Sequence, residues 1–548
     1  MKFHIYFLAA FVAVLFKGDV VAQSLPTGTI AIEEYLRRKQ VSGDSSLVAS
    51  FSIRPIHNWL DAAHDYLFPN TEVNGFELSS NPGNQKKFLR ILPISINQQF
   101  NSRHPHGWND GSMIPAKGYQ LQFSGGFFAK AGSFSLQLRP EVVYAQNLTF
   151  EGFPTSFSDT LWKSYYKVLN RIDNPERFTS GQFLKLFPGQ SSVRFNQKKL
   201  SVGLSTENLW WGPGIRNSLL MSNTAPGFPH LTFNTTAPIL TNFGSLEWQL
   251  IGGILENSNV LPPETNRTFE GDPLYVPKPV DDRFINAMIL TWQPKWTKGL
   301  HLGFARSFYQ YTSGIPRSFN GYLPVFGSFF KSRAQDEAKF GRDQLISLFF
   351  RLLMPESKAE VYAEFGRNDH SQNLNDLVQE PEHARAYIIG LRKLFPTNSR
   401  KDLELFMEIT HLQNPPTRTL RDLEGWYTHY QVRHGYTTQG QVLGAGIGPG
   451  GSSQSLALNW LQHSNKLGFM FERIVRNNDF YYDAFEQSKN FGRHWVDLCF
   501  NLNKSWAQKQ FLYTANLSLI NSIHYQWKRD QNRMNVQAAL SAVYFVSR

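Results

Sequence analysis

Apolar and polar residues alternate along much of the chain with a period of two residues. Between residues 511 and 527 the odd positions are mostly apolar and the even positions are mostly polar. The same alternation at 119–127 and 134–138, joined by a short turn at Ala131-Gly132, predicts a β-hairpin. Further alternating segments lie at 200–206, 245–255, 343–352, 358–366, 386–395, 402–411, 455–462, 466–475, 494–502 and 536–546. This pattern predicts an all-β protein.

The length of these segments favours a membrane barrel over a soluble sheet. Strands in soluble sheets usually have about five or six residues, whereas a strand that crosses a membrane needs roughly nine to eleven. Several of the alternating segments reach this length. The segment 402–411 also places Asp402, Glu404 and Glu408 on one face, which suits a water-filled lumen better than a sealed core. We therefore predict an antiparallel transmembrane β-barrel rather than a soluble sandwich or propeller.

The first 85 residues follow a different pattern. Residues 1–22 contain Lys2, an apolar run from Phe3 to Phe16 and a small-residue site ending at Ala22, which predicts a cleaved secretory signal peptide. Helical spacing at 29–39 and 56–68 predicts a small periplasmic helical element within residues 23–85.

The remaining residues, 86–548, would form the barrel. At roughly 25 residues for each strand with its connection, they provide for about 16 to 20 strands, and an even number is expected. Connections rich in Pro, Gly and Asn at 256–283, 310–341 and 412–454 are expected to be extracellular loops.

Composition excludes several classes of protein. Hydrophobic residues make up 41% of the chain, but the mean hydropathy is −0.35, and no later run reaches the roughly 18 apolar residues of a spanning helix. The single cysteine, Cys499, excludes an intrachain disulfide and a multi-cysteine metal site. The formal net charge of +12 would attract an acidic polymer, but it would equally attract the anionic headgroups of outer-membrane lipids.

The most distinctive motif lies within residues 207–226. Its candidate functional residues are Trp210, Trp211, Gly212, Pro213, Gly214, Arg216, Ser222 and Asn223. The paired indoles, the Gly-Pro-Gly turn and the following Ser-Asn-Thr-Ala-Pro segment resemble the signature of the Wzi family of outer-membrane capsule assembly proteins. The resemblance implies an eighteen-stranded barrel preceded by a helical bundle. It also implies a surface lectin that attaches capsular polysaccharide to the outer membrane of a Gram-negative bacterium.

The chemistry of the motif is compatible with polysaccharide binding. Indole faces pack against the apolar CH faces of sugars, Ser and Asn side chains bond to hydroxyl groups, and Arg216 can bind a uronate carboxylate through two hydrogen bonds. A structural role is the alternative, because tryptophan pairs also occupy membrane interfaces and Gly-Pro-Gly forms a tight turn.

We therefore predict a monomeric, non-enzymatic barrel that binds capsular or other surface polysaccharide and attaches it to the cell surface. A passive channel for small solutes is the alternative function. The sequence contains neither G-x-S-x-G nor H-E-x-x-H, and it has no nucleic-acid-binding module. His104 and His106 are close in sequence but lack a clear third ligand, so we expect neither a metal ion nor a cofactor.

Overall fold

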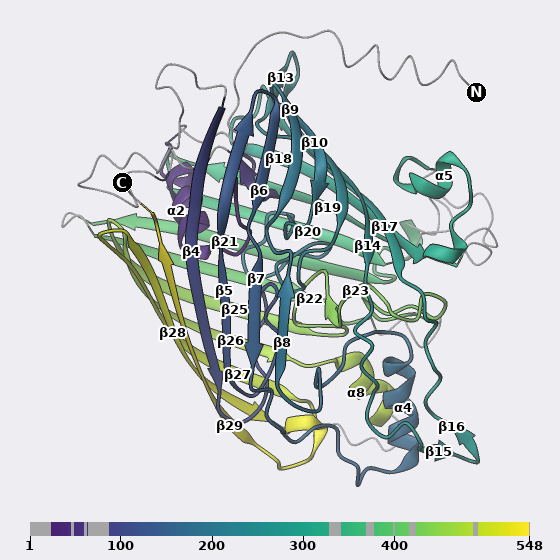
Figure 1. The fold of residues 1–548 in the computed structure, drawn as a ribbon. Coiled ribbons are helices and arrows are strands. Elements are labelled where there is room, and N and C mark those ends of the chain that lie inside the picture. Colours follow the sequence, from purple (N-terminus) through teal and green to yellow (C-terminus); the bar gives the residue numbers. More distant parts are fainter. Residues whose placement is uncertain are drawn as a thin grey trace.

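The computed structural model describes residues 23–44, 49–57, 59, 63, 87–327, 341–368, 378–397, 401–415, 423–485 and 492–546. Most of this chain forms one closed antiparallel β-barrel (Figure 1). The predicted signal peptide, residues 1–22, and most of the predicted helix at 56–68 lie outside the described residues. None of the described helices is both long and apolar enough to cross a lipid bilayer.

In the described part of the chain the barrel wall has 18 strands, the number that the family resemblance implied. Three wall strands are interrupted, so β6 with β7, β8 with β9, and β12 with β13 each count as one. The bounds are β4 (Lys87–Asn101), β5 (Gly118–Ala131), β6 (Phe134–Leu138), β7 (Glu141–Ala145), β8 (Phe183–Phe187), β9 (Ser192–Gln197), β10 (Leu200–Ser205), β12 (His230–Thr235), β13 (Ile239–Thr241), β14 (Gly244–Leu255), β17 (Arg283–Pro294), β18 (Leu300–Tyr311), β19 (Arg342–Met354), β20 (Ala359–Asn368), β21 (Arg385–Pro396), β22 (Asp402–His411), β25 (Ser452–Gln462), β26 (Asn465–Val475), β27 (Val496–Gln508), β28 (Phe511–Ile523) and β29 (Arg533–Tyr544).

Pairing between the first and last wall strands closes the barrel. In this pairing Tyr544 lies opposite Ile94 and Gln537 lies opposite Asn101. The register between β4 and β5 shifts between Leu92 and Ser95. Closure leaves no unpaired sheet edge, which is required because lipid offers no hydrogen-bond partner to backbone N–H and C=O groups.

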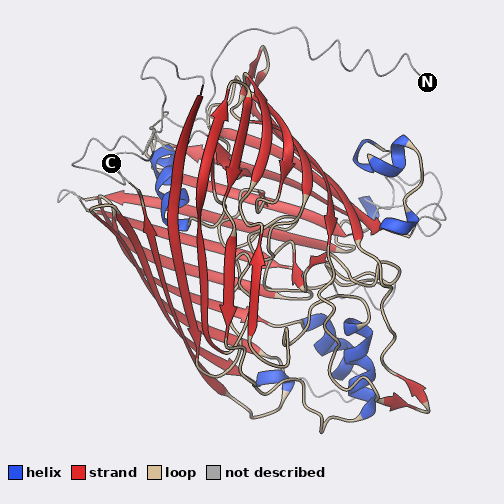
Figure 2. Cartoon of the chain, viewed as in Figure 1, coloured by secondary structure: helices blue, strands red, loops and turns tan. Residues whose placement is uncertain are grey.

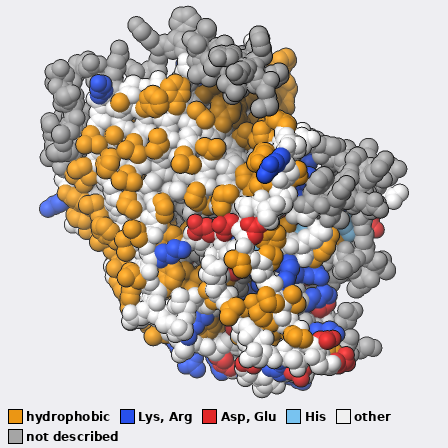
Figure 3. All heavy atoms as spheres, turned by 45° about the vertical axis from the view of Figure 1, so that its right-hand side comes forward, with side chains coloured by type: hydrophobic (Ala, Val, Ile, Leu, Met, Phe, Trp, Pro, Cys, Tyr) orange, Lys and Arg blue, Asp and Glu red, His pale blue; other side chains and the backbone are white. Residues whose placement is uncertain are grey.

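Alternation along each strand assigns one face to lipid and the other to the lumen. Leu517 and Leu519 on β28 are 45% and 46% exposed, whereas Ser518 between them is 1% exposed. Hydrophobic side chains are spread over the outer wall (Figure 3). Glu404 and Glu408 are buried inside the barrel, which confirms the lumenal position predicted for these two carboxylates. Asp402, predicted on the same face, is exposed at the end of the strand.

One predicted strand is shorter than its sequence pattern indicates. Alternation continues to Trp527, but β28 ends at Ile523. His524 and Gln526 have positive φ angles of 48° and 56°, which are incompatible with an extended strand. The chain therefore turns at the rim, and Tyr525 and Trp527 become buried.

The two rims of the barrel differ in the length of their connections. Short turns such as 132–133, 463–464 and 509–510 lie at the rim where β4 begins and β29 ends, which we call the short-turn rim. Long connections lie at the opposite, long-loop rim. Helices α4 (Asp159–Leu169) and α8 (Asn478–Phe485) gather at this rim (Figure 2). The long-loop rim also carries β15 (Thr268–Phe269), β16 (Asp272–Pro273), η1 (Thr312–Gly314), α5 (Phe319–Tyr322), η2 (Pro324–Phe326) and η4 (Tyr525–Trp527).

The described parts of the predicted loops 256–283, 310–341 and 412–454 all belong to the long-loop rim. The third of these loops folds back into the barrel instead of remaining outside it. It carries β23 (Thr437–Thr438) and β24 (Gln441–Val442). Tyr427 and Tyr436 of this loop are fully buried, so it forms part of the barrel interior.

The N-terminal segment also lies inside the barrel. It consists of β1 (Ser24–Leu25), α2 (Ile30–Val41), β2 (Ile53–Arg54) and β3 (Ile56–His57). The helix predicted at 29–39 is thus confirmed as α2, with an acidic residue in its first turn and basic residues in its last, as the helix dipole favours. Ile56–His57, at the start of the second predicted helix, instead pairs with β1 as a short strand.

The assignment of the two faces of the wall predicts how a charge on β28 will act. Leu517→Arg should lower the free energy of unfolding by about 2–4 kcal/mol, because Leu517 faces lipid midway along the strand. The measurement is a urea titration in lipid vesicles, followed by the heat-modifiable mobility of the folded protein. The control is Asn516→Arg, because Asn516 lines the lumenal cavity. This substitution should lower the free energy of unfolding by less. Equal losses for the two variants would contradict the assignment.

Candidate functional site

The WWGPG motif, residues 210–214, lies in the loop between β10 and β12, which enters the lumen from the long-loop rim. Trp210 and Trp211 form the short strand β11 (Trp210–Trp211), which pairs with β2 of the N-terminal segment. Gly212 has a φ angle of 118°, and a Cβ atom there would lie 2.7 Å from Glu364 Oε2, so the turn favours glycine. Two segments that come from opposite ends of the barrel therefore meet inside it.

The two indoles of the motif have different surroundings. Trp211 is fully buried, and its Nε1 donates a hydrogen bond to Gln249 Oε1 at 2.9 Å. Trp210 is 3% exposed and lies under the Arg54 guanidinium, 4.8 Å from its ring centroid. The Nε1 of Trp210 has no hydrogen-bond partner in the described part of the chain. Trp211 is thus part of a packed core, while Trp210 keeps an unused donor.

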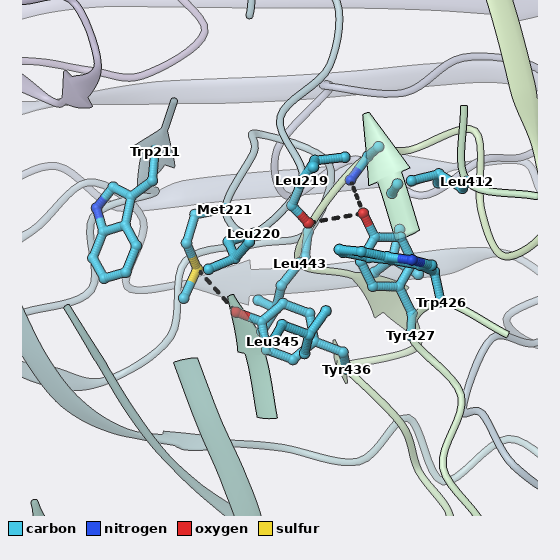
Figure 4. Packing of buried hydrophobic residues seen from close by; sticks show 14 of the residues in the cluster. Trp211, Leu219, Leu220, Met221, Leu345, Leu412, Trp426, Tyr427, Tyr436 and Leu443 are labelled. Atoms are coloured by element: carbon cyan, nitrogen blue, oxygen red, sulfur yellow. Dashed lines mark hydrogen bonds between the residues drawn. The ribbon is translucent and has the colours of Figure 1, made fainter. Parts of the chain in front are cut away.

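Three long loops, those that follow β4, β10 and β22, pack together within the lumen as a hydrophobic core. Figure 4 shows residues of the second and third of these loops in contact. Trp108 comes from the loop after β4, Leu219 and Met221 come from the loop of the motif, after β10, and Tyr427 and Tyr436 come from the loop after β22. The Tyr427 hydroxyl donates to the carbonyl of Leu219 at 2.8 Å. These contacts fill the part of the barrel interior where the three loops meet.

The turn after the motif is held by carboxylates of the barrel wall. Glu408 of β22 accepts hydrogen bonds from the backbone N–H groups of Ile215, Arg216 and Asn217 at 2.7, 3.1 and 2.9 Å. Arg216 makes two further bonds with Glu472 of β26, at 2.9 and 3.2 Å. Although burial opposes it, the neighbouring carboxylates raise the pKa of Arg216. Arg216 is therefore charged, and Glu472 already compensates that charge.

Ser222 and Asn223 connect this loop to its neighbours. Ser222 Oγ donates to the carbonyl of Gly444 at 2.6 Å, and Asn223 Nδ2 donates to the carbonyl of Asn109 at 2.8 Å. The structure thus places all eight predicted site residues in one loop within the barrel. Their contact with sugar remains a prediction.

Trp210, Arg216 and Asn223 also border a lumenal cavity of about 440 Å³. The cavity lies between the N-terminal segment and the inner face of the wall. Many amide side chains of the wall contribute to its lining, including Asn97, Gln99, Gln122, Asn459, Asn501, Asn503, Asn516 and Gln537. Such a surface offers many hydrogen-bond donors and acceptors to water or to a hydroxyl-rich ligand.

A cluster of buried charges holds α2 against the wall. Glu360 of β20 lies between Arg37 of α2, at 2.8 Å, and Arg351 of β19, at 2.7 Å. Glu34 of α2 contacts Lys466 of β26 at 2.6 Å. Burial would raise the pKa of Glu34, but Lys466 and Arg38 lower it to about 2. Glu34 is therefore ionised at neutral pH.

The sequence analysis missed an aromatic cluster at the long-loop rim. It joins α4, α8 and η4, and its buried members are Phe153, Trp162, Tyr165, Tyr166, Leu169, Leu274, Phe480, Tyr481, Phe485 and Trp527. Within α4, Trp162, Tyr165, Tyr166 and Leu169 recur at helical spacing after the N-cap Ser158. That spacing is the signal that would have predicted the helix and its buried face.

The two histidines considered as metal ligands have other surroundings. His104 stacks on Tyr525 with ring centroids 4.8 Å apart, and burial lowers the pKa of His106 to about 3. Within the described ranges, no group of three or more His, Cys, Asp or Glu side chains could hold a metal ion.

Several solved structures are similar to this chain. Wzi of Escherichia coli, described as an outer membrane protein involved in group 1 capsule assembly and as a carbohydrate binding β-barrel, aligns over 96% of this chain and 100% of its own. The identity is 13% and the TM-score is 0.61, so the two proteins share a fold. OccK7 of Pseudomonas aeruginosa (8% identity, 82% and 98% coverage, TM-score 0.38) and OccAB4 of Acinetobacter baumannii (10%, 85% and 99%, 0.37) also match. No curated protein sequence matches the chain.

A family profile covers most of the barrel. The profile described as "Capsule assembly protein Wzi" matches residues 102–525, which include the whole WWGPG loop. A closed antiparallel barrel with an even number of strands and an apolar outer wall is typical of bacterial outer-membrane proteins. The chain is an outer-membrane β-barrel that belongs to the Wzi family of capsule assembly proteins, as its paired indoles and Gly-Pro-Gly turn indicated.

Proposed function

We propose that this protein binds capsular or other surface polysaccharide at the extracellular rim of the barrel and attaches it to the cell surface without catalysing a reaction. Family membership supports this role, as does the carbohydrate binding of Escherichia coli Wzi. Outer-membrane barrels have short periplasmic turns and longer extracellular loops. The long-loop rim is therefore the extracellular one in this proposal.

The packed lumen is the observation that carries the proposal over a passive channel. Fully buried Trp211, Trp426 and Tyr427 lie in the core that joins the three loops inside the barrel. A channel for solutes requires a continuous water-filled path, and such a core obstructs one. The lumenal cavity is bordered by this loop assembly on one side and by the N-terminal segment on the other.

The N-terminal segment has a supporting role in this proposal. The segment that carries β1, α2, β2 and β3 would enter the barrel from the periplasm after the signal peptide, residues 1–22, is removed. Arg37 and Glu34 hold α2 to the wall, and β2 pairs with the WWGPG motif. The protein would act as a monomer whose apolar wall contacts outer-membrane lipids.

We propose two contributions from the WWGPG loop. Trp211 stabilises the loop assembly through its buried ring. Trp210, Arg216 and Asn223 border the cavity, where the ring edge of Trp210 would contact a sugar and the amide of Asn223 would bond to its hydroxyl groups. The first contribution concerns stability and the second concerns binding, so substitutions can separate them.

Deletion of the gene should move polysaccharide from the cell surface to the culture medium while the total amount stays unchanged. The reason is that a lectin affects attachment but not synthesis. The measurement is the polymer in the cell-bound and medium fractions, with the restored wild-type gene as the control. An unchanged cell-bound fraction would contradict the proposed function.

The purified protein should show no steady ion conductance in planar lipid bilayers, because its loops pack across the lumen. The measurement is single-channel recording, with a known outer-membrane porin incorporated in parallel as a positive control. Reproducible conductance steps of porin size would instead support the passive channel.

Single substitutions of the two indoles should have different effects. Trp211→Ala should lower the free energy of unfolding by about 3–5 kcal/mol, because it leaves a cavity in the lumenal core. Trp210→Ala should cost less stability but reduce polysaccharide retention. The measurements are the midpoint of the heat-modifiable band shift and the cell-bound polymer. Normal retention by the Trp210→Ala variant would exclude a sugar contact for this residue.

A further inference from the structure

A second, separate pocket lies at the long-loop rim and has a volume of about 320 Å³. Three connections form it: the loop after β4, the loop after β7 and the turn between β28 and β29. Its walls include Arg103, Lys117, Phe150, Glu151, Tyr525 and Arg533. None of these residues belongs to the WWGPG loop.

The pocket carries positive charge that is not neutralised locally. Its one carboxylate, Glu151, is shared by Arg533 at 2.9 Å and by Lys528 at 3.3 Å. Lys117 Nζ donates to the carbonyl oxygen of Thr149 at 3.0 Å. Among the described residues, neither Lys117 nor Arg103 has a carboxylate partner. Two cationic side chains therefore remain available to an anionic ligand.

The floor of the pocket is aromatic and held in place. The rings of His104 and Tyr525 are stacked with centroids 4.8 Å apart, and both residues are buried. The Tyr525 hydroxyl donates to the carbonyl oxygen of Glu151 at 2.8 Å, which connects the floor to one wall. Burial lowers the pKa of His104, so its imidazole is neutral at pH 7. This packed floor fixes the loop that carries Arg103, whose guanidinium group can bind a carboxylate through two hydrogen bonds.

The position of the pocket favours a polymer over a lipid headgroup. Arg533 begins β29 and has the same strand parity as Asn535 and Gln537, which are buried toward the lumen. Its side chain therefore lies on the inner side of the wall, away from the outward face that meets lipid. A chain resting on the extracellular loops can reach this position.

We propose that this pocket binds a carboxylate-bearing sugar residue of the surface polysaccharide, with Arg103 and Lys117 contacting the carboxylate and the buried Tyr525 closing the bottom of the pocket. Its volume lies within the range of roughly 300–1,000 Å³ for small-molecule sites. The assignment rests on the proposed function, because it names the part of the polymer that the rim recognises.

The test measures binding of two polymers to full-length protein in detergent. The probes are surface polysaccharide extracted from the bacterium that makes this protein and the same material after reduction of its carboxyl groups to alcohols. The pocket variant is Arg103→Gln with Lys117→Gln. The matched control is Lys295→Gln with Lys298→Gln, which removes the same charge from an exposed turn at the opposite rim. Heat-modifiable mobility verifies that each variant is folded.

The pocket variant should bind the native polymer at least about tenfold more weakly, since a hydrogen bond to a charged group contributes about 1.5–3 kcal/mol. Carboxyl reduction should weaken wild-type binding by a similar factor and should not weaken the pocket variant further. The control variant should bind as the wild type does. Added salt should reduce wild-type affinity more than that of the pocket variant.

Each other outcome has a distinct meaning. If the wild type does not bind the native polymer, the proposed function itself fails and the pocket assignment fails with it. If the wild type binds but the pocket variant binds equally, or if the carboxyl-reduced polymer binds the wild type equally, only the pocket assignment is overturned. It is also overturned if the pocket variant loses affinity for vesicles containing lipopolysaccharide while its affinity for the polymer is unchanged.

Discussion

The Glu360 carboxylate joins the N-terminal helix to the barrel wall through two guanidinium groups, those of Arg37 and Arg351. Removing three charged groups from water carries a large desolvation cost, which close pairing offsets only when the geometry is good. A shift of α2 by one residue would rotate Arg37 by about 100° around the helix axis and leave buried charges without partners. The ion cluster therefore specifies the position of α2, and α2 in turn positions β2, the strand that meets the WWGPG motif.

This constraint explains why the barrel interior is a folded core rather than a lined pore. Segments from both rims meet at the pairing of β2 with β11, and the three long loops pack around that junction. The wall contributes apolar residues such as Ile289 and Leu345 to the same core, although polar lumenal residues dominate around the cavity. One part of the lumen is thus packed like the interior of a soluble protein, and the part around the cavity offers amide groups to water or ligand.

The net charge of +12 suggests a general attraction for an acidic polymer, but the position of each cationic side chain decides whether it contributes. Arg37 and Arg351 share Glu360, and Arg216 pairs with Glu472, so these three guanidinium groups are engaged inside the barrel. Arg103 and Lys117 differ from these three arginines because they line a pocket at the rim, where a polymer outside the barrel can reach them. The attraction of an acidic polysaccharide would thus depend on a few unpaired rim cations more than on the overall charge.

The sequence by itself determined the wall, because which side of a strand faces lipid is a local property. Alternation predicted that Glu404 and Glu408 face the lumen, helical spacing predicted α2, and the WWGPG motif indicated the family. The early end of β28 required backbone angles that alternation does not reveal.

Only the tertiary structure decided where the motif lies and what it contacts. Three features of the site bring together residues that are far apart in the chain. They are the pairing of Trp210 with Arg54, the bond between Arg216 and Glu472, and the pocket that contains both Arg103 and Arg533. These contacts depend on closure of the barrel, which brings β29 beside β4, and on the matching of buried charges across the lumen. No local sequence pattern encodes barrel closure or the matching of buried charges, so the contacts of the site could be identified only in the folded chain.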